Sequence, residues 1–157
     1  MAARQAADVT EGKDIHVLET RSIPQGLAAC INFNPDTDAE SNEAAMQEAI
    51  SHVKTGQITY AVRDTRVDNK EIHEGDYMGV GDKGILAVGK DRIQVALDTL
   101  EEMADDSCEV ISVYYGTDTT EEEVASLEEK ITEKYPEYEI EVNNGGQPIY
   151  YYILSVE

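Results

Sequence analysis

The spacing of apolar side chains in residues 57–157 constrains the fold more than any other feature of this chain. In QITYAVRDT, residues 57–65, apolar and polar residues alternate, which predicts a strand with Ile58, Tyr60 and Val62 on one face. YMGV, GDKG and ILAV, residues 77–88, predict a hairpin whose turn uses the backbone freedom of glycine. An amphipathic helix follows, because apolar residues recur at helical spacing at Ile93, Ala96, Leu97, Leu100 and Met103.

The C-terminal third continues this pattern. CEVISVYY predicts a strand over residues 108–115, and residues 118–136 predict a helix with a buried stripe at Val124, Leu127, Ile131 and Tyr135. Its capping box is either Thr119 with Glu122 or Thr120 with Glu123. YEIEV and PIYYYILSV predict two more strands, so residues 55–157 read β-β-β-α-β-α-β-β. This order predicts a two-layer domain with a mixed sheet and two helices.

Residues 1–54 predict a separate, smaller α/β domain. MAARQAADV resembles the last turns of a helix without a capping residue before it, which predicts that the chain is a fragment. DIHVLET, residues 14–20, predicts a strand, and two helices are predicted over residues 24–33 and 38–53. KTG at residues 54–56 interrupts the helical pattern. The overall prediction is an α/β to α+β protein with domains at residues 1–54 and 55–157.

The charge of the chain excludes several classes of partner. Its 33 Asp and Glu residues outnumber 12 Lys and Arg residues, for a formal net charge of −21. Such a chain is repelled by nucleic acid phosphates and by anionic lipid. No apolar run approaches the roughly 20 residues of a membrane span, and no signal peptide is apparent. We therefore expect a cytoplasmic protein that neither binds nucleic acid nor inserts into a membrane, with Cys30 and Cys108 reduced.

The sequence contains no nucleophile with a neighbouring base, so no catalytic residue is predicted. The densest polar stretch, RDTRVDNKEIHEGD, departs from the calcium-loop pattern, and we interpret it as an acidic connector rather than a metal site. In this stretch, the residues whose side chains could in principle gather around a metal ion are Asp64, Asp68, His73, Glu74 and Asp76. Arg63, beside Asp64 at a strand end, is predicted either to form a local ion pair or to contact a partner or an anionic ligand.

The chain ends in NNGGQPIYYYILSVE, residues 143–157. Tyr150, Tyr152, Leu154 and Val156 share one face of the predicted strand, and the other face is also apolar, which predicts a strand covered on both sides. The glycines of the preceding turn would let backbone amides approach a neighbour closely. The turn consists of Asn144, Gly145, Gly146 and Gln147.

Four segments carry a family resemblance. TRSIPQGLAACINFNPDTD, KTGQITYAVRDT, EIHEGDYMG and NNGGQPIYYYILSVE, in this order, resemble the C-terminal region of the ATP-binding subunit of bacterial fatty acid kinase, also labelled dihydroxyacetone-kinase-like. That region is similar to the DegV fold of the fatty-acid-carrying subunit. The resemblance implies ATP and magnesium chemistry in a preceding kinase domain, and no cofactor in this chain. It also implies an incomplete first domain, whose strand near residues 15–19 should form an exposed edge.

The resemblance further implies a non-catalytic interaction module that docks the fatty-acid-carrying DegV-like subunit or forms a homodimer. The alternative is a fatty acid or carboxylate binding module of DegV type. NNGGQP stands where DegV proteins carry a His-Thr-Gly-Pro-Gly-like motif that helps to hold the carboxylate, and it lacks the histidine. The predicted partner- or ligand-binding residues are Ser22, Gln25, Gly26, Tyr60, Arg63, Asp64, Asn144, Gly145, Gly146 and Gln147.

Overall fold

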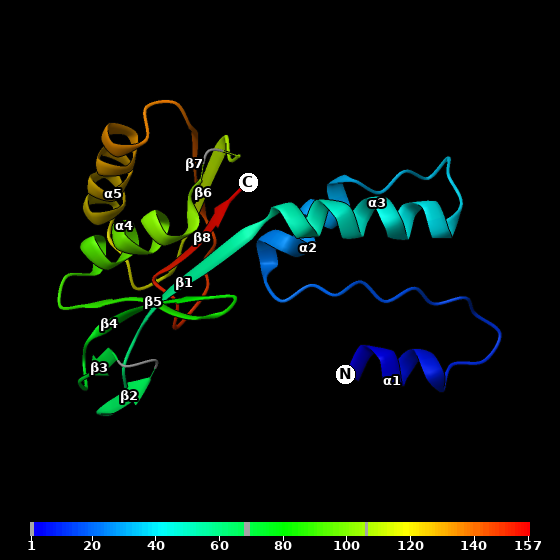
Figure 1. Cartoon of the computed structure of the whole chain (residues 1–157), viewed down its shortest axis with the longest axis horizontal. Coiled ribbons are helices and arrows are strands. Elements are labelled where there is room, and N and C mark those ends of the chain that lie inside the picture. Colours follow the sequence, from blue (N-terminus) through cyan, green and yellow to red (C-terminus); the bar gives the residue numbers. More distant parts are fainter. Residues whose placement is uncertain (1, 68–69, 106) are drawn as a thin grey trace. The chain divides into compact units, whose positions relative to one another are not determined.

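The structure is a computed structural model that describes residues 2–67, 70–105 and 107–157, and the chain divides into two compact units (Figure 1). The first unit spans Met1–Val53 and the second Lys54–Glu157.

The first unit contains α1 (Ala2–Asp8), α2 (Ile23–Ile31) and α3 (Ala39–His52). Ser22 caps the N-terminus of α2, and the proline of this helix lies in the first turn, where no backbone N–H is needed. Asp38 caps the N-terminus of α3, and its carboxylate accepts the Ser41 N–H at 2.9 Å. The unit buries few apolar side chains, and most of them are small: Pro24, Ala28, Ala29, Ile50 and Val53.

The predicted strand at residues 14–20 was wrong, and with it the exposed strand edge near residues 15–19. This segment has no regular secondary structure, and no described residue of the unit lies in a strand. A strand exists only where its backbone groups find a ladder partner. Here His16 Nδ1 instead contacts Glu43 of α3 at 2.5 Å. The described part of this unit is therefore helical.

The second unit is a six-stranded mixed sheet in the order β5-β4-β1-β8-β6-β7. Strands β6 and β7 are parallel and the other neighbours are antiparallel. The strands are β1 (Lys54–Tyr60), β4 (Tyr77–Gly81), β5 (Gly84–Gly89), β6 (Val110–Tyr115), β7 (Glu139–Asn144) and β8 (Tyr152–Val156). Two short strands, β2 (Thr65–Val67) and β3 (Lys70–Ile72), form a separate ribbon in the acidic connector.

Helices α4 (Arg92–Met103) and α5 (Glu121–Lys134) lie beside the sheet (Figure 1). Their buried side chains form one core with those of the strands. The core includes Ile58 of β1, Leu100 of α4, Leu127 of α5 and Leu154 of β8, each at most 1% exposed. The mixed sheet with two helices is confirmed, in the predicted element order. Of the two capping boxes considered for α5, the structure contains Thr120 with Glu123.

Two strand boundaries differ from the prediction. Strand β1 begins at Lys54, because Gly56 lets the strand approach α4: a Cβ there would lie 2.7 Å from the Met103 sulfur. Strand β8 begins at Tyr152 rather than Pro148, since the Tyr150 N–H bonds the Pro148 carbonyl at 2.8 Å. The final strand is nevertheless buried throughout, which confirms that both of its faces are covered.

Candidate functional site

Most of the predicted site residues lie at one end of the main sheet in the second unit. Tyr60 ends β1, Arg63 and Asp64 follow it, and Asn144 ends β7. The other three, Ser22, Gln25 and Gly26, lie at the start of α2 in the first unit.

The loop over residues 145–151 connects β7 to β8 and is braced against the end of β6. Gly145 and Gly146 donate their N–H groups to the Tyr115 carbonyl at 3.0 and 3.2 Å. The Gln147 amide nitrogen donates to the carbonyls of Tyr114 at 2.9 Å and Tyr150 at 3.3 Å. These donors are therefore already satisfied within the protein, and they do not form an open cradle for an anion.

Gly116, which follows β6, allows this loop to pack closely. A Cβ at Gly116 would lie 2.3 Å from the Tyr150 carbonyl oxygen and 2.6 Å from that of Gln147. The Gly116 N–H donates to Tyr151 at 2.8 Å, and the Thr117 N–H donates to Gln147 at 3.1 Å. Glycine is thus required here by close backbone approach.

A tyrosine cluster covers the same end of the sheet. The ring of Tyr151 meets Tyr77 edge to face at 5.6 Å between centroids and Tyr60 at 6.3 Å. The Arg92 guanidinium lies 4.1 Å from the centroid of the Tyr151 ring. Such cation–π contact adds to the packing of the aromatic rings. The cluster joins β1, β4, the start of α4 and the segment before β8.

Arg92 is the centre of this cluster, and its side chain is only 13% exposed. It donates to the Asp118 carbonyl at 3.1 Å and forms an ion pair with Glu123, the third helical residue of α5 and a member of its capping box. Burial lowers the pKa of Arg92, but the hydrogen bond and charge of Glu123 outweigh burial and raise it. The Arg92 guanidinium therefore stays charged, and it ties the N-termini of α4 and α5 together. Burial also raises the pKa of the nearby Tyr152 hydroxyl, to about 12.

Next to the cluster lies an exposed surface that we call the tyrosine-end surface, formed by Tyr60, Val62, Arg63 and Ile149. Tyr60, Val62 and Ile149 are 44%, 73% and 63% exposed. The Thr59 hydroxyl donates to the Ile149 carbonyl at 3.3 Å, which holds the two segments together. Ile149 has a φ of 74°, a left-handed conformation that is costly for a β-branched residue.

Arg63 is exposed, and it makes no ion pair with any residue that the structure describes. Its neighbour Asp64 instead accepts the backbone N–H of Glu74 at 2.7 Å. The local ion pair between Arg63 and Asp64 is thus not formed here. A guanidinium of this kind is available to a partner carboxylate.

In the first unit, two of the three predicted residues have structural contacts. The Ser22 hydroxyl caps α2 by accepting the Gln25 N–H at 3.4 Å. Gln25 is buried, accepts the Arg21 N–H at 2.9 Å and donates to the Val53 carbonyl at 3.3 Å. Gly26 faces open space, because a Cβ there would meet no atom within 4 Å.

The acidic connector folds into a turn. Asp76, 5% exposed, accepts the His73 N–H at 2.8 Å and forms an ion pair with Lys90, which lowers the pKa of its carboxyl. Asp68 lies outside the described residues. Over residues 2–67, 70–105 and 107–157, no group of three or more His, Cys, Asp or Glu side chains is placed to hold a metal ion.

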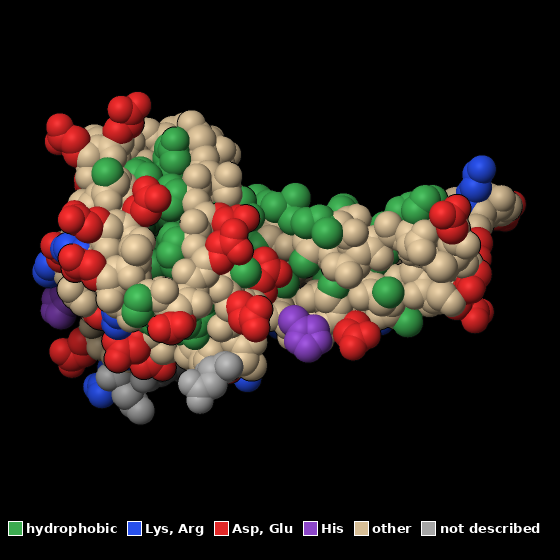
Figure 2. Space-filling model, turned by 90° about the horizontal axis from the view of Figure 1, so that it is seen from above, with side chains coloured by type: hydrophobic (Ala, Val, Ile, Leu, Met, Phe, Trp, Pro, Cys, Tyr) green, Lys and Arg blue, Asp and Glu red, His purple; other side chains and the backbone are tan. Residues whose placement is uncertain are grey.

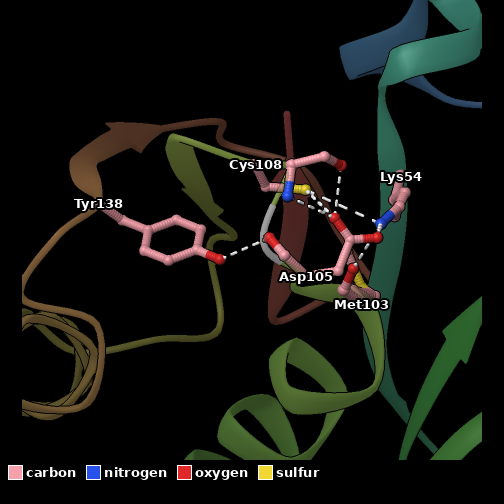
Figure 3. A network of polar contacts seen from close by, with 6 residues as sticks. Lys54, Met103, Asp105, Cys108 and Tyr138 are labelled. Carbon is pink, nitrogen blue, oxygen red and sulfur yellow. Dashed lines mark hydrogen bonds and ion pairs between the residues drawn. The ribbon is translucent and has the colours of Figure 1, made fainter.

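A second polar cluster surrounds Cys108 near the start of β1 (Figure 3). The Lys54 amine donates to the Met103 carbonyl at 3.1 Å, pairs with Asp105, and lies 3.8 Å from the Cys108 sulfur. The Tyr138 hydroxyl donates to the Asp105 carbonyl at 2.9 Å. The hydrogen bond from Lys54 holds the pKa of Asp105 well below its usual range, and Asp105 raises the pKa of Lys54. The cluster fixes the end of α4 to the first residue of β1.

The sequence prediction missed Arg92 and Ile149. One signal for Arg92 was present: a cation in the first turn of a helix is unfavourable near the positive end of the helix dipole, and therefore requires a partner. Ile149 gave no such signal, because its conformation depends on the bonds of the whole loop.

The structure defines an α+β protein with a mixed sheet, and no helix among the described residues combines the length and apolarity of a bilayer span. The chain belongs to the family of C-terminal regions of FakA-like fatty acid kinase proteins, whose model matches residues 1–157. This match confirms the resemblance to the C-terminal region of a fatty acid kinase subunit.

Curated relatives agree with this assignment. The chain is 43% identical over 157 residues to Protein YloV of Bacillus subtilis (strain 168). It is 38% identical over the same length to the uncharacterized proteins SAR1202 and SAUSA300_1119 of Staphylococcus aureus strains MRSA252 and USA300. Each match covers 100% of this chain and 28% of the relative, so the chain spans little more than a quarter of these proteins.

Proposed function

We propose that this chain is a non-catalytic interaction module of a fatty acid kinase subunit, which docks the fatty-acid-carrying DegV-like subunit through the tyrosine-end surface. The observation that carries the proposal is the exposure of Tyr60, Val62 and Ile149 beside an arginine without a described ion partner. Tyrosine and arginine are enriched among the residues that carry most of the binding energy of protein interfaces. In the longer relatives, ATP and magnesium would bind outside the region that this chain covers.

The conformation of Ile149 supports the proposal. A β-branched residue at positive φ costs on the order of 1–3 kcal/mol, and such strain is concentrated at functional sites. The cost is not offset by burial in this chain, since the side chain is 63% exposed. Burial against a partner would contribute about 1.5–3 kcal/mol for a fully covered isoleucine.

Charge also supports a protein partner at this surface. The chain carries a net charge of −21, and Figure 2 shows Asp and Glu side chains, in red, over the visible face of the larger unit, with few Lys and Arg side chains in blue. Arg63 is one of the exposed cations of this acidic chain, and it lies directly beside Val62. It fits a partner carboxylate in bidentate geometry.

The alternative function, binding of a fatty acid carboxylate by the loop over residues 145–151, has less support. A carboxylate needs free donors, whereas Gly145, Gly146 and Gln147 donate to carbonyls of the protein. Binding at this loop would require those hydrogen bonds to break, at about 1 kcal/mol each.

Two substitutions at Arg63 test the proposal, with the affinity of the longer protein for the fatty-acid-carrying subunit as the measured quantity. Arg63→Ala should weaken binding roughly 10- to 100-fold, the loss expected for a charge-assisted hydrogen bond, and Arg63→Lys should recover only part of it. Lys83→Ala is the matched control, because Lys83 is an exposed cation in the β4–β5 turn. The melting temperature should remain unchanged in all three variants.

Ile149→Gly separates binding from stability, because glycine tolerates positive φ without strain. We expect unchanged or higher stability together with weaker binding. Unaltered binding by both Ile149→Gly and Arg63→Ala would contradict docking at this surface. A fatty acid found bound to the purified chain by mass spectrometry would favour the alternative.

A further inference from the structure

The two edges of the main sheet are protected differently. At the β5 edge, the Lys70 amine donates to the carbonyls of Ile85 at 2.8 Å and Leu86 at 2.6 Å. A lysine bound in this way blocks the addition of another strand. At the opposite edge, β7 is paired with β6 on one side, and no described strand lies on its other side.

The hydrogen bonds to β6 show which backbone groups of β7 point outward. The Glu139 N–H donates to the Glu109 carbonyl at 2.8 Å, and the Gly145 N–H donates to Tyr115 at 3.0 Å. Because backbone groups alternate in direction along a strand, Glu141 and Asn143 also face β6. The alternate residues of β7, Ile140, Val142 and Asn144, therefore direct their backbone N–H and C=O groups away from β6, toward the free edge of the sheet.

The side chains of β7 define what could lie beside it. Glu139 and Glu141 are exposed on one face of the strand, while Ile140 and Val142 are half-buried on the other and pack against the core. A strand added to this edge would place its side chains next to the same two faces in alternation. On one face of the sheet the side chains of the added strand would lie beside the carboxylates of Glu139 and Glu141. On the other face they would lie beside the apolar side chains of Ile140 and Val142.

We propose that the β7 edge binds an extended basic segment of another protein, in which Lys or Arg alternates with apolar residues, as an additional strand of the sheet. Main-chain hydrogen bonds would supply affinity, and the carboxylates of Glu139 and Glu141 would select basic side chains. A second copy of this chain is disfavoured, because pairing of two β7 strands would bring glutamates together in a chain of charge −21. The proposal is independent of docking at the tyrosine-end surface.

A synthetic peptide tests this directly. Acetyl-KVKVKVK-amide should bind the chain, and its binding should slow hydrogen exchange at the amides of Ile140, Val142 and Asn144. The matched peptide acetyl-EVEVEVE-amide should bind at least about tenfold more weakly, because like charges on neighbouring strands repel. Equal binding of the two peptides, absence of binding, or protection confined to other amides would overturn the proposal.

Charge reversal provides the matched variant. Glu139→Lys with Glu141→Lys should exchange the preference, so that the acidic peptide binds better than the basic one. Glu74→Lys with Glu102→Lys makes the same change in net charge at exposed positions outside β7 and should leave the preference intact. If both variants lose the preference for the basic peptide, that preference reflects the net charge of the chain, and the proposal that the peptide binds at the β7 edge is overturned. Concentration-dependent dimerisation that protects the three amides would instead identify a second copy as the occupant.

Discussion

Replacement of Gly116 by alanine tests whether the loop over residues 145–151 is packed as described. The new Cβ would lie 2.3 and 2.6 Å from the carbonyl oxygens of Tyr150 and Gln147, which are backbone atoms and cannot rotate away. Overpacking costs about 1–3 kcal/mol. Displacement of the loop would also weaken, without breaking, the hydrogen bonds donated by Gly116 and Thr117, at a combined cost of about 1 kcal/mol. We expect a total loss of about 2–4 kcal/mol in the free energy of unfolding.

For a unit of this size, that loss lowers the melting temperature by roughly 10–20 °C, which thermal unfolding monitored by circular dichroism will detect. Two other glycines serve as controls. Gly146→Ala should cost only about 1–2 kcal/mol, from its φ of 61°, and Gly26→Ala should be neutral or stabilising, because it lies in a helix facing open space. A Gly116→Ala variant within about 0.5 kcal/mol of the wild type would refute the packing of this loop.

Three further outcomes are expected. The first unit should lose stability as the pH rises above about 6.5, because Glu43 and then Asp14 raise the pKa of His16 in the folded state, and His16→Gln should remove this dependence in pH-resolved unfolding curves. Thr120→Ala should destabilise the second unit by about 1 kcal/mol in urea titration, since it removes the capping box with Glu123. The purified chain should show no ATPase, kinase or phosphatase turnover in a phosphate-release assay, and turnover that survives purification to homogeneity would contradict a non-catalytic role.

The sequence predicted the second unit well because its elements are long and strongly periodic. The apolar stripe of α5, from Val124 to Ile131, packs into the same hydrophobic core as the apolar final strand. The local sequence pattern and the tertiary structure therefore agree. The short β2–β3 ribbon was missed, since three-residue strands carry too little pattern to be recognised. KTG was misread for a related reason, because a glycine that serves close packing against α4 resembles a break.

Prediction was weaker where structure depends on distant partners. DIHVLET has the alternation of a strand, yet alternation alone cannot supply a neighbouring strand to complete the ladder. The turn before the last strand was predicted correctly at Gly145 and Gly146, but the sequence could not show that the N–H groups of these glycines are bonded to the Tyr115 carbonyl. Arg92 likewise becomes informative only when Tyr151 and Glu123 are brought to it by the fold.

Hydrogen–deuterium exchange of the longer protein, measured with and without the fatty-acid-carrying subunit, tests the proposed docking most directly. If the tyrosine-end surface is the contact, peptides that cover residues 59–64 and 145–151 should gain protection on complex formation. The Arg63→Ala variant should lose that protection at the same subunit concentration, and the Lys83→Ala variant should keep it. A complex that forms while both segments exchange as in the free protein would contradict the proposed docking.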